Sequence, residues 1–142
     1  MKPREPLSLV AGLLAIVWTG FLKAETLHIT VTNVPQSQGT IMLQILSNET
    51  EFNGEGSAIV SLMQRAQSGE MHFAATLPDG EYAFRVMHDL NDNGELDSNF
   101  VGMPTEPWAF SNNAVGKFGP PQWSDVRFEL RDDLTQTIDL NF

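Results

Sequence analysis

The chain has 142 residues, the length of one domain, and carries 18 acidic against 8 basic residues, a formal net charge of −10. So acidic a surface repels nucleic acid and anionic lipid headgroups, and neither partner is expected. Cysteine is absent, which excludes disulfides and a lipid-anchored cysteine and leaves the fold to its core, with a bound metal as further support.

The N-terminal segment has the form of a secretory signal peptide. A short basic start, Met1 to Arg4, precedes an apolar run over residues 7–22, and Ala24 is a small residue at the cleavage position. We predict a signal peptide over residues 1–24, cleaved after Ala24, and a periplasmic or secreted protein that does not insert into a membrane afterwards. The alternative is a retained anchor, for which an apolar run of 16 residues is slightly short. Cleavage removes three basic residues and one acidic residue, which leaves a formal charge of −12.

Residues 25–142 are predicted to form a single domain made of strands. Apolar and polar residues alternate in six runs, as expected of half-buried antiparallel strands. The apolar positions are Leu27, Ile29 and Val31; Ile41, Leu43 and Ile45; Met71, Phe73, Ala75 and Leu77; Tyr82, Phe84 and Val86; Val126, Phe128 and Leu130; and Ile138, Leu140 and Phe142. Turn-forming residues separate the runs at 35–39, 78–80 and 131–133, and Pro78-Asp79-Gly80 predicts a tight hairpin. Six or seven short strands at this spacing predict an all-β fold, a β-sandwich.

Two segments depart from the strand pattern. Residues 56–67 place apolar side chains at helical spacing, which predicts one short helix across an end of the sandwich, preceded by a polar loop over 49–56. The second segment runs for 36 residues from Asp89 to Ser124 and has no regular pattern beyond 99–101. A loop of this length inside a compact domain is usually functional or specially stabilised.

This long segment opens with a run, Asp89 to Asp97, that follows the pattern of a calcium-binding loop. Oxygen-bearing side chains stand at alternate positions, a glycine allows a sharp turn at the sixth position, and a carboxylate follows at the ninth. The predicted Ca²⁺ ligands are the side chains of Asp89, Asn91, Asn93 and Asp97 and the backbone carbonyl of Glu95. Phe100 stands where the helix-loop-helix calcium motif has a bidentate Glu, so the affinity should be weak, and a last ligand must come from Glu106 or carbonyls near Asn99. The alternative is a metal-free turn in which Asx side chains bind their own backbone.

Aromatic residues crowd the end of the long segment, residues 108–123. Buried, they would form a satellite core beneath the loop, which we favour; exposed, they would form a platform for a sugar ring or a peptide. Two neighbouring asparagines offer amide groups to a partner or a left-handed turn, and the turn is preferred. The predicted partner surface consists of Trp108, Phe110, Asn112, Asn113, Phe118 and Trp123.

His88 precedes the calcium-type loop and has the inward parity of its strand. One hypothesis is a small metal-dependent hydrolase that uses His88 and the nearby carboxylates. A histidine that orders the loop by hydrogen bonding is favoured, since no Ser-His-Asp set, Cys-His set or phosphate-binding glycine loop can be assembled from the sequence. A non-enzymatic role is therefore preferred.

Several of these segments together resemble a known family. They are 77–83 (LPDGEYA), 88–97 (HDLNDNGELD), 102–107 (GMPTEP), 110–114 (FSNNA) and 118–121 (FGPP). The combination is similar to the exported bacterial domain-of-unknown-function family 2141 over essentially all of residues 25–142. In that family a Lys often stands at Glu95 and an aromatic-glycine pair at Trp108-Ala109, and neither difference affects a predicted oxygen ligand. The resemblance implies an immunoglobulin- or transthyretin-like sandwich outside the cytoplasm and brings no established activity.

The leading hypothesis is a periplasmic or secreted, non-enzymatic β-sandwich in which weakly bound Ca²⁺ orders the long loop. The loop would present residues 110–113 and 118–123 to a protein or glycan partner. The competing hypotheses are the hydrolase and a purely structural domain whose Asx-rich loop binds nothing.

Overall fold

The computed structural model of the chain describes residues 22–141. The predicted signal peptide, residues 1–24, lies outside the described residues except for its last three, and so does Phe142 at the end of the last predicted strand. Within residues 22–141, no helix has the length and apolar character needed to cross a membrane.

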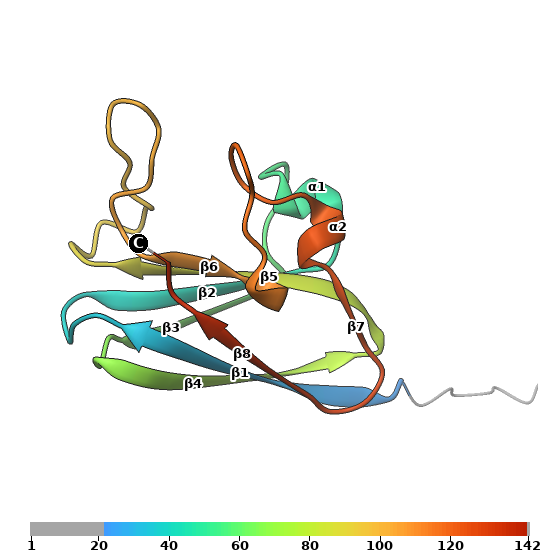
Figure 1. Cartoon of the computed structure of the whole chain (residues 1–142). Helices are drawn as coiled ribbons and strands as arrows, with labels where there is room; N and C mark the ends of the chain where they lie inside the picture. The colour runs from blue at the N-terminus through green and yellow to red at the C-terminus, as the bar shows by residue number, and fades with distance from the viewer. Residues whose placement is uncertain (1–21, 142) are drawn as a thin grey trace, which may run out of the picture.

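Eight strands within the described residues form two sheets that enclose a core (Figure 1). The strands are β1 (Ala24–Val34), β2 (Thr40–Leu46), β3 (Val60–Arg65), β4 (Gly69–Pro78), β5 (Gly80–Asp89), β6 (Trp108–Phe110), β7 (Phe128–Leu130) and β8 (Leu134–Asp139). The helices are α1 (Glu49–Phe52), the 3₁₀ turn η1 (Ser111–Asn113) and α2 (Trp123–Val126). One sheet has the order β4-β1-β8 and the other β3-β2-β5-β6, with β7 paired to the start of β5. The predicted all-β fold is confirmed, with one or two more strands than expected.

The three-stranded sheet contains a parallel pair that the sequence did not predict. β4 runs antiparallel to β1, with Ile29 opposite Phe73, whereas β8 runs parallel to β1, with Ile29 opposite Gln136. The parallel pair arises because the chain enters β8 from β7, which belongs to the other sheet. A strand that arrives from the opposite layer is not constrained to the antiparallel direction of a hairpin.

The predicted turns join strands of different sheets. The hairpin predicted at Pro78-Asp79-Gly80 is wrong, because β4 pairs with β1 whereas β5 pairs with β2. The turns at 35–39 and 131–133 likewise lead from one sheet to the other. Turn residues determine that the chain reverses, but the hydrogen-bonding partner of each strand is chosen by the packing of the layers.

The core between the sheets is built from the predicted alternation. Leu27, Ile29 and Val31 of β1 are at most 1% exposed, whereas His28 between them is exposed. The main cluster also contains the predicted inward residues Ile41, Leu43, Ile45, Met71, Phe73, Leu77, Tyr82, Phe84, Val86, Leu130, Ile138 and Leu140. The assignment of inward faces is therefore confirmed for both sheets, but the strand predicted to include Val126 is shorter than expected: Val126 ends α2 and is buried in a second cluster.

The helix predicted over residues 56–67 is wrong. β3 lies there instead and pairs antiparallel with the edge of β2. Its Val60 and Leu62 are partly buried against the core, whereas Ser61 and Met63 are exposed, so the period is two. In so short a run intrinsic propensity is weak, and pairing with an available sheet edge decides the structure.

Regular structure also interrupts the two segments predicted to be loops. α1 lies within 49–56, where Asn48 accepts the N–H of Glu51 at 2.9 Å and Glu51 accepts the N–H of Ser47 at 2.7 Å. The 36-residue segment contains β6, which pairs with β5, followed by η1. It is thereby divided into a proximal loop, residues 90–107, and a distal loop, residues 114–122, which project on the same side of the molecule (Figure 1).

Candidate functional site in the proximal loop

Asp89 is the last residue of β5, and its carboxylate lies inside the turn that follows. The strand carries it into the interior, where it is 2% exposed. Its Oδ1 accepts the N–H of Asn93 at 3.1 Å and its Oδ2 accepts the N–H of Gly94 at 2.7 Å. Asp92 and Gly94 have φ values of 58° and 82°, left-handed conformations that reverse the chain. The sharp turn predicted at Gly94 is confirmed, with the first carboxylate of the pattern buried within it.

The side chains of Asn91, Asn93 and Asp97 meet around the same turn. Asn91 Nδ2 donates to one carboxylate oxygen of Asp97 at 2.6 Å, and Asn93 Nδ2 donates to the other at 2.9 Å. The amide oxygen of Asn91 accepts the N–H of Asn93 at 3.1 Å, and that of Asn93 accepts the N–H of Glu95 at 2.9 Å. The side chains of Asn91, Asn93 and Asp97 are thus joined by hydrogen bonds, and the Asp89 carboxylate is joined to this group through the backbone N–H of Asn93. It also contains the Asx turns of the alternative interpretation.

Glu106 braces this loop from the returning chain. The side chain is nearly buried, with 4% of the residue exposed. Its Oε1 accepts the N–H of Leu90 at 2.8 Å and its Oε2 accepts the N–H of Asp97 at 3.0 Å. Both oxygens are occupied by backbone donors, so Glu106 clamps the two ends of the loop together. From the sequence, Glu106 was predicted only as a candidate for the last metal ligand. Its bracing role could have been suspected because Glu106 is the only charged residue within residues 98–107.

Asp92 lies outside the predicted ligand set and ties the loop to the neighbouring sheet. Its Oδ1 accepts the hydroxyl of Thr40 at 2.7 Å, and its Oδ2 accepts Arg65 Nη1 at 2.8 Å. The hydrogen bond from Thr40, which has the larger effect, and the one from Arg65 lower the pKa of Asp92 from its ordinary value of 3.8. The Arg65 side chain is 77% exposed, so the ion pair orients the loop more than it stabilises the fold.

The turn between β1 and β2 packs against the base of the loop. A Cβ atom on Gly39 would lie 2.0 Å from the carbonyl oxygen of Asp89, and Gly39 has a φ of 77°. The adjacent Gln38 donates its Nε2 to the carbonyl of Leu90 at 3.1 Å. Close backbone approach and left-handed geometry together require glycine at position 39.

His88 is held in the interior beside this turn. It is 0% exposed, which confirms its predicted inward direction. Its Nε2 lies 2.6 Å from the carbonyl oxygen of Gln38, and because a carbonyl can only accept, Nε2 carries the hydrogen. Within the described residues, Nδ1 has no hydrogen-bond partner. The imidazole therefore links β5 to the β1–β2 turn, as expected of a histidine that orders a loop.

Three of the predicted partner-surface residues pack into a small cluster. The ring centroid of Phe52 in α1 lies 5.8 Å from that of Phe110 and 6.1 Å from that of Trp123, and Trp108 and Phe110 are 5.4 Å apart. Phe110 and Trp123 are partly buried against a second core beneath the helices. This is the satellite core that the sequence favoured. Phe118, by contrast, is fully exposed.

The two predicted surface asparagines form the left-handed turn of η1. Asn112 and Asn113 have φ values of 61° and 51°, which confirms the predicted turn. Asn112 Nδ2 donates to the carbonyls of Asp125 and Arg127, at 3.1 Å and 3.0 Å, and Asn113 Nδ2 donates to that of Thr137 at 3.0 Å. The amide donors therefore fasten η1 to the neighbouring chain.

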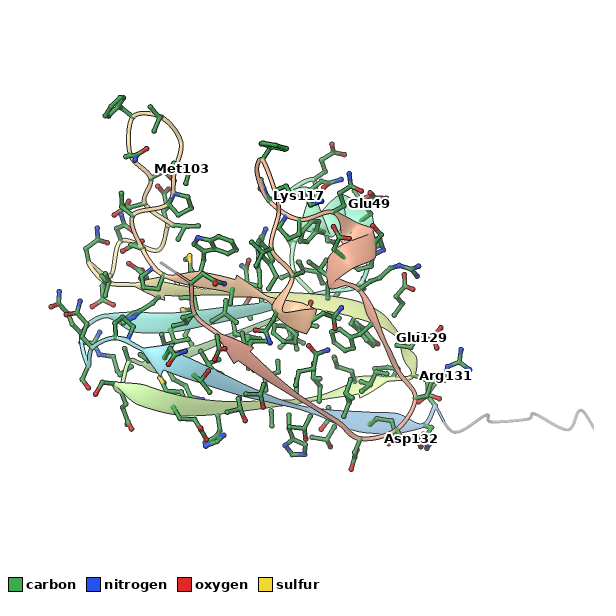
Figure 2. All side chains as sticks on the ribbon, viewed as in Figure 1. Glu49, Met103, Lys117, Glu129, Arg131 and Asp132 are labelled. Carbon is green, nitrogen blue, oxygen red and sulfur yellow. The ribbon has the colours of Figure 1, made fainter. Side chains whose placement is uncertain are left out.

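Exposed apolar side chains stand on both loops, and most were not among the predicted site residues. Figure 2 shows the two projections, with Met103 labelled on the proximal loop and Lys117 on the distal loop. The apolar residues more than 60% exposed are Phe100, Val101 and Met103 on the proximal loop and Val115 and Phe118 on the distal loop. The sequence feature that could have identified them is the presence of large apolar residues among the turn-forming asparagine, glycine and proline residues of both loops.

The donor set of the calcium-type loop fits a hard cation. Every candidate atom is an oxygen, supplied by two carboxylates, two amides and one backbone carbonyl, as Ca²⁺ prefers. Residues 22–141 contain no group of three or more His, Cys, Asp or Glu side chains that could hold a metal. To admit the ion, Asn91 and Asn93 would turn their amide oxygens toward Asp97 in place of Nδ2.

Comparison with protein families identifies a match over most of the chain. The profile of a bacterial family described as "Uncharacterized protein conserved in bacteria (DUF2141)" matches residues 29–138. The matched region begins within β1, ends within β8 and includes both loops. No curated protein and no solved structure matches the chain. The chain belongs to this family of uncharacterised bacterial proteins.

Proposed function

We propose that this protein is an exported, non-enzymatic binding module whose proximal loop is ordered by Ca²⁺. The observation that carries the proposal is the convergence of Asp89, Asn91, Asn93 and Asp97 on one turn, with Glu106 as its brace. Export rests on the signal peptide predicted over residues 1–24. Asn91 and Asn93 both donate to the Asp97 carboxylate, and the turn that they form lies at the base of the proximal loop.

The chain offers five groups to the ion. They are the carboxylates of Asp89 and Asp97, the amide oxygens of Asn91 and Asn93, and the carbonyl of Glu95. Bound Ca²⁺ supplies the positive charge that would hold the two carboxylates together. Because only two ligands are charged, the expected Kd is about 10⁻⁴–10⁻³ M, the range of extracellular modules.

The hydrolase hypothesis receives less support. General acid–base chemistry needs a side chain within hydrogen-bonding reach of the substrate. His88 is 0% exposed and its Nε2 is bound to the carbonyl of Gln38. Its imidazole therefore serves the fold, and the binding module is the better account of the site.

Thermal unfolding of residues 25–142, the predicted mature protein, with Ca²⁺ and with chelator tests the metal site. At a concentration about tenfold above Kd, an ion that binds only the folded state adds about 1.4 kcal/mol. For a domain of this size, that raises the midpoint by roughly 5 °C. Mg²⁺ at the same concentration should raise it less, because its smaller octahedral shell fits a flexible loop poorly.

Two isosteric variants of the same loop provide the comparison. Asp97→Asn removes a ligand charge and should abolish the Ca²⁺ increment, whereas Asp92→Asn, outside the ligand set, should retain it. An unchanged wild-type midpoint across the titration would remove the Ca²⁺ proposal. Equal loss of the increment in both variants would show that general electrostatics, rather than a site, is responsible.

A further inference from the structure

The two loops place apolar side chains in full contact with solvent. Phe100 is 100% and Phe118 is 105% exposed, and Val101, Met103 and Val115 are each more than 60% exposed. Single exposed apolar residues are ordinary, but a group on neighbouring projections marks an interaction site. Both loops rise beyond the β5–β6 side of the sandwich, toward the same side as α1 and α2 (Figure 1).

The proximal projection is a closed turn rather than a loose chain. Ser98 and Pro104 form an isolated β-bridge at its neck. Asn99 accepts the N–H groups of Val101 and Met103 with its Oδ1, both at 3.0 Å, and its own N–H donates to the Met103 carbonyl at 2.8 Å. Four of the backbone donors at the tip, those of Asn99, Val101, Gly102 and Met103, are therefore satisfied internally, which lowers the cost of bringing the tip into a medium poor in water.

The distal projection is also folded back on itself. A Cβ atom on Gly116 would lie 1.8 Å from the carbonyl oxygen of Gly119, so the two arms of the turn are in contact. Phe118 lies between these glycines, and Pro120 and Pro121 begin the return. The close approach therefore holds an exposed ring at the outer end of the turn.

The charge of the two projections differs from that of the whole protein. The chain has 18 acidic residues, yet residues 98–104 carry no charge and residues 114–121 carry only Lys117. Lys117 is exposed and directly precedes Phe118. An ammonium group beside an apolar ring suits a surface that offers phosphate at one depth and hydrocarbon below it.

We propose that the ends of the proximal and distal loops are a docking surface for a phospholipid bilayer. Phe100 and Phe118 enter the headgroup region, Lys117 contacts phosphate oxygens, and the sandwich stays outside the membrane. Two separate convex projections fit a deformable surface better than a protein groove, which would have to match both. A sugar-binding platform needs free polar groups beside the ring, and the amide oxygen of Asn99 is already used within its turn.

The acidity of the remaining surface selects the lipid. After cleavage of residues 1–24 the formal charge is −12, so the body of the protein is repelled by anionic headgroups, as expected from the sequence. The favoured surface is therefore zwitterionic. The side chains at the loop ends would touch only the surface region of the bilayer, so the proposed binding is peripheral and requires no segment that crosses the membrane. The inference names the partner of the binding module and rests on that proposal only for the position of the proximal loop.

Flotation of residues 25–142 with unilamellar vesicles tests the inference. Vesicles of phosphatidylcholine and phosphatidylethanolamine should carry the protein upward, and replacing part of the lipid with phosphatidylglycerol should reduce binding at low ionic strength. Each of Phe100→Ser and Phe118→Ser should weaken partitioning by about tenfold, and the double variant by about a hundredfold. Lys117→Glu should weaken it several-fold, which non-specific adsorption of apolar groups would not produce.

Met63→Ser is the matched control, because Met63 is 63% exposed but lies on β3, away from both loops. It should bind vesicles like wild type. Failure of wild type to float, or equal binding by wild type and the double Phe variant, would overturn the inference. The same variants should keep their Ca²⁺ increment in thermal unfolding, so loss of vesicle binding and loss of the metal site are separate results.

Discussion

Removal of the Glu106 carboxylate should release the proximal loop from the sandwich. Glu106 is 4% exposed and accepts the N–H groups of Leu90 and Asp97, at 2.8 Å and 3.0 Å. These donors lie at the two ends of the calcium-type loop. Glu106→Gln keeps the shape of the side chain but turns one acceptor into a donor that faces a backbone N–H group.

The magnitude follows from the two hydrogen bonds. A bond to a charged acceptor is worth about 1.5–3 kcal/mol, and a buried donor left without a partner costs about 1–3 kcal/mol. Leu90 and Asp97 are partly exposed, so water replaces some of what is lost. We therefore expect Glu106→Ala to reduce the free energy of unfolding by about 3 kcal/mol and Glu106→Gln by about 2 kcal/mol. Out of a typical total of roughly 5–15 kcal/mol, this is a large fraction.

Two measurements separate loop release from unfolding of the sandwich. Urea denaturation followed by tryptophan fluorescence reports the global free energy. Amide hydrogen exchange at Leu90 and Asp97 reports local opening and should accelerate in both Glu106 variants. Glu95→Gln is the matched control, since Glu95 is acidic, lies in the same loop and is exposed. If Glu106→Gln matched Glu95→Gln in both measurements, the brace would have no energetic role.

Two further predictions concern the anchoring of the loop. Gly39→Ala should destabilise the protein by more than about 3 kcal/mol in urea denaturation, because the added Cβ would lie 2.0 Å from a backbone oxygen. Gly54 is the control: it has a φ of 85° and no atom within 4 Å of an added Cβ, so Gly54→Ala should cost only about 1 kcal/mol. Similar losses in the two variants would contradict the close approach at Gly39. Thr40 and Arg65 lower the folded-state pKa of Asp92 below 3.8, so the stability from these contacts is present above pH 3.8 and is lost as the pH falls through the folded pKa. A carboxyl NMR titration of Asp92 that returned 3.8 or more would refute that assignment.

The faces of the strands were predictable because alternation is a local property. Leu27, Ile29 and Val31 alternate with polar residues, and burial of that face follows from the pleat alone. The same reasoning failed over 56–67, where a short run fitted both a helix and a strand. The edge of β2, which accepts β3, lies outside that window, so no local count identifies it.

The candidate site was predictable in part for the same reason. Asp89, Asn91, Asn93 and Asp97 lie within nine residues, and the turn at Gly94 brings them together without help from distant chain. Glu106 is brought in by the return of the loop to β6, and Thr40 and Arg65 by strands far away in the sequence. Such contacts depend on how the loop is placed against the sheets.

By itself, the sequence determined the all-β class, the inward faces, the acidic surface and the oxygen-rich turn after β5. Each of these is set by neighbours along the chain, through strand pleat, side-chain polarity or turn geometry. Only the tertiary structure decided which sheet each strand joins, the parallel direction of β8, the bracing role of Glu106 and the common side on which the two loops project. These features depend on contacts between distant segments, whose formation is governed by the burial of both sheets at once rather than by any single stretch of sequence.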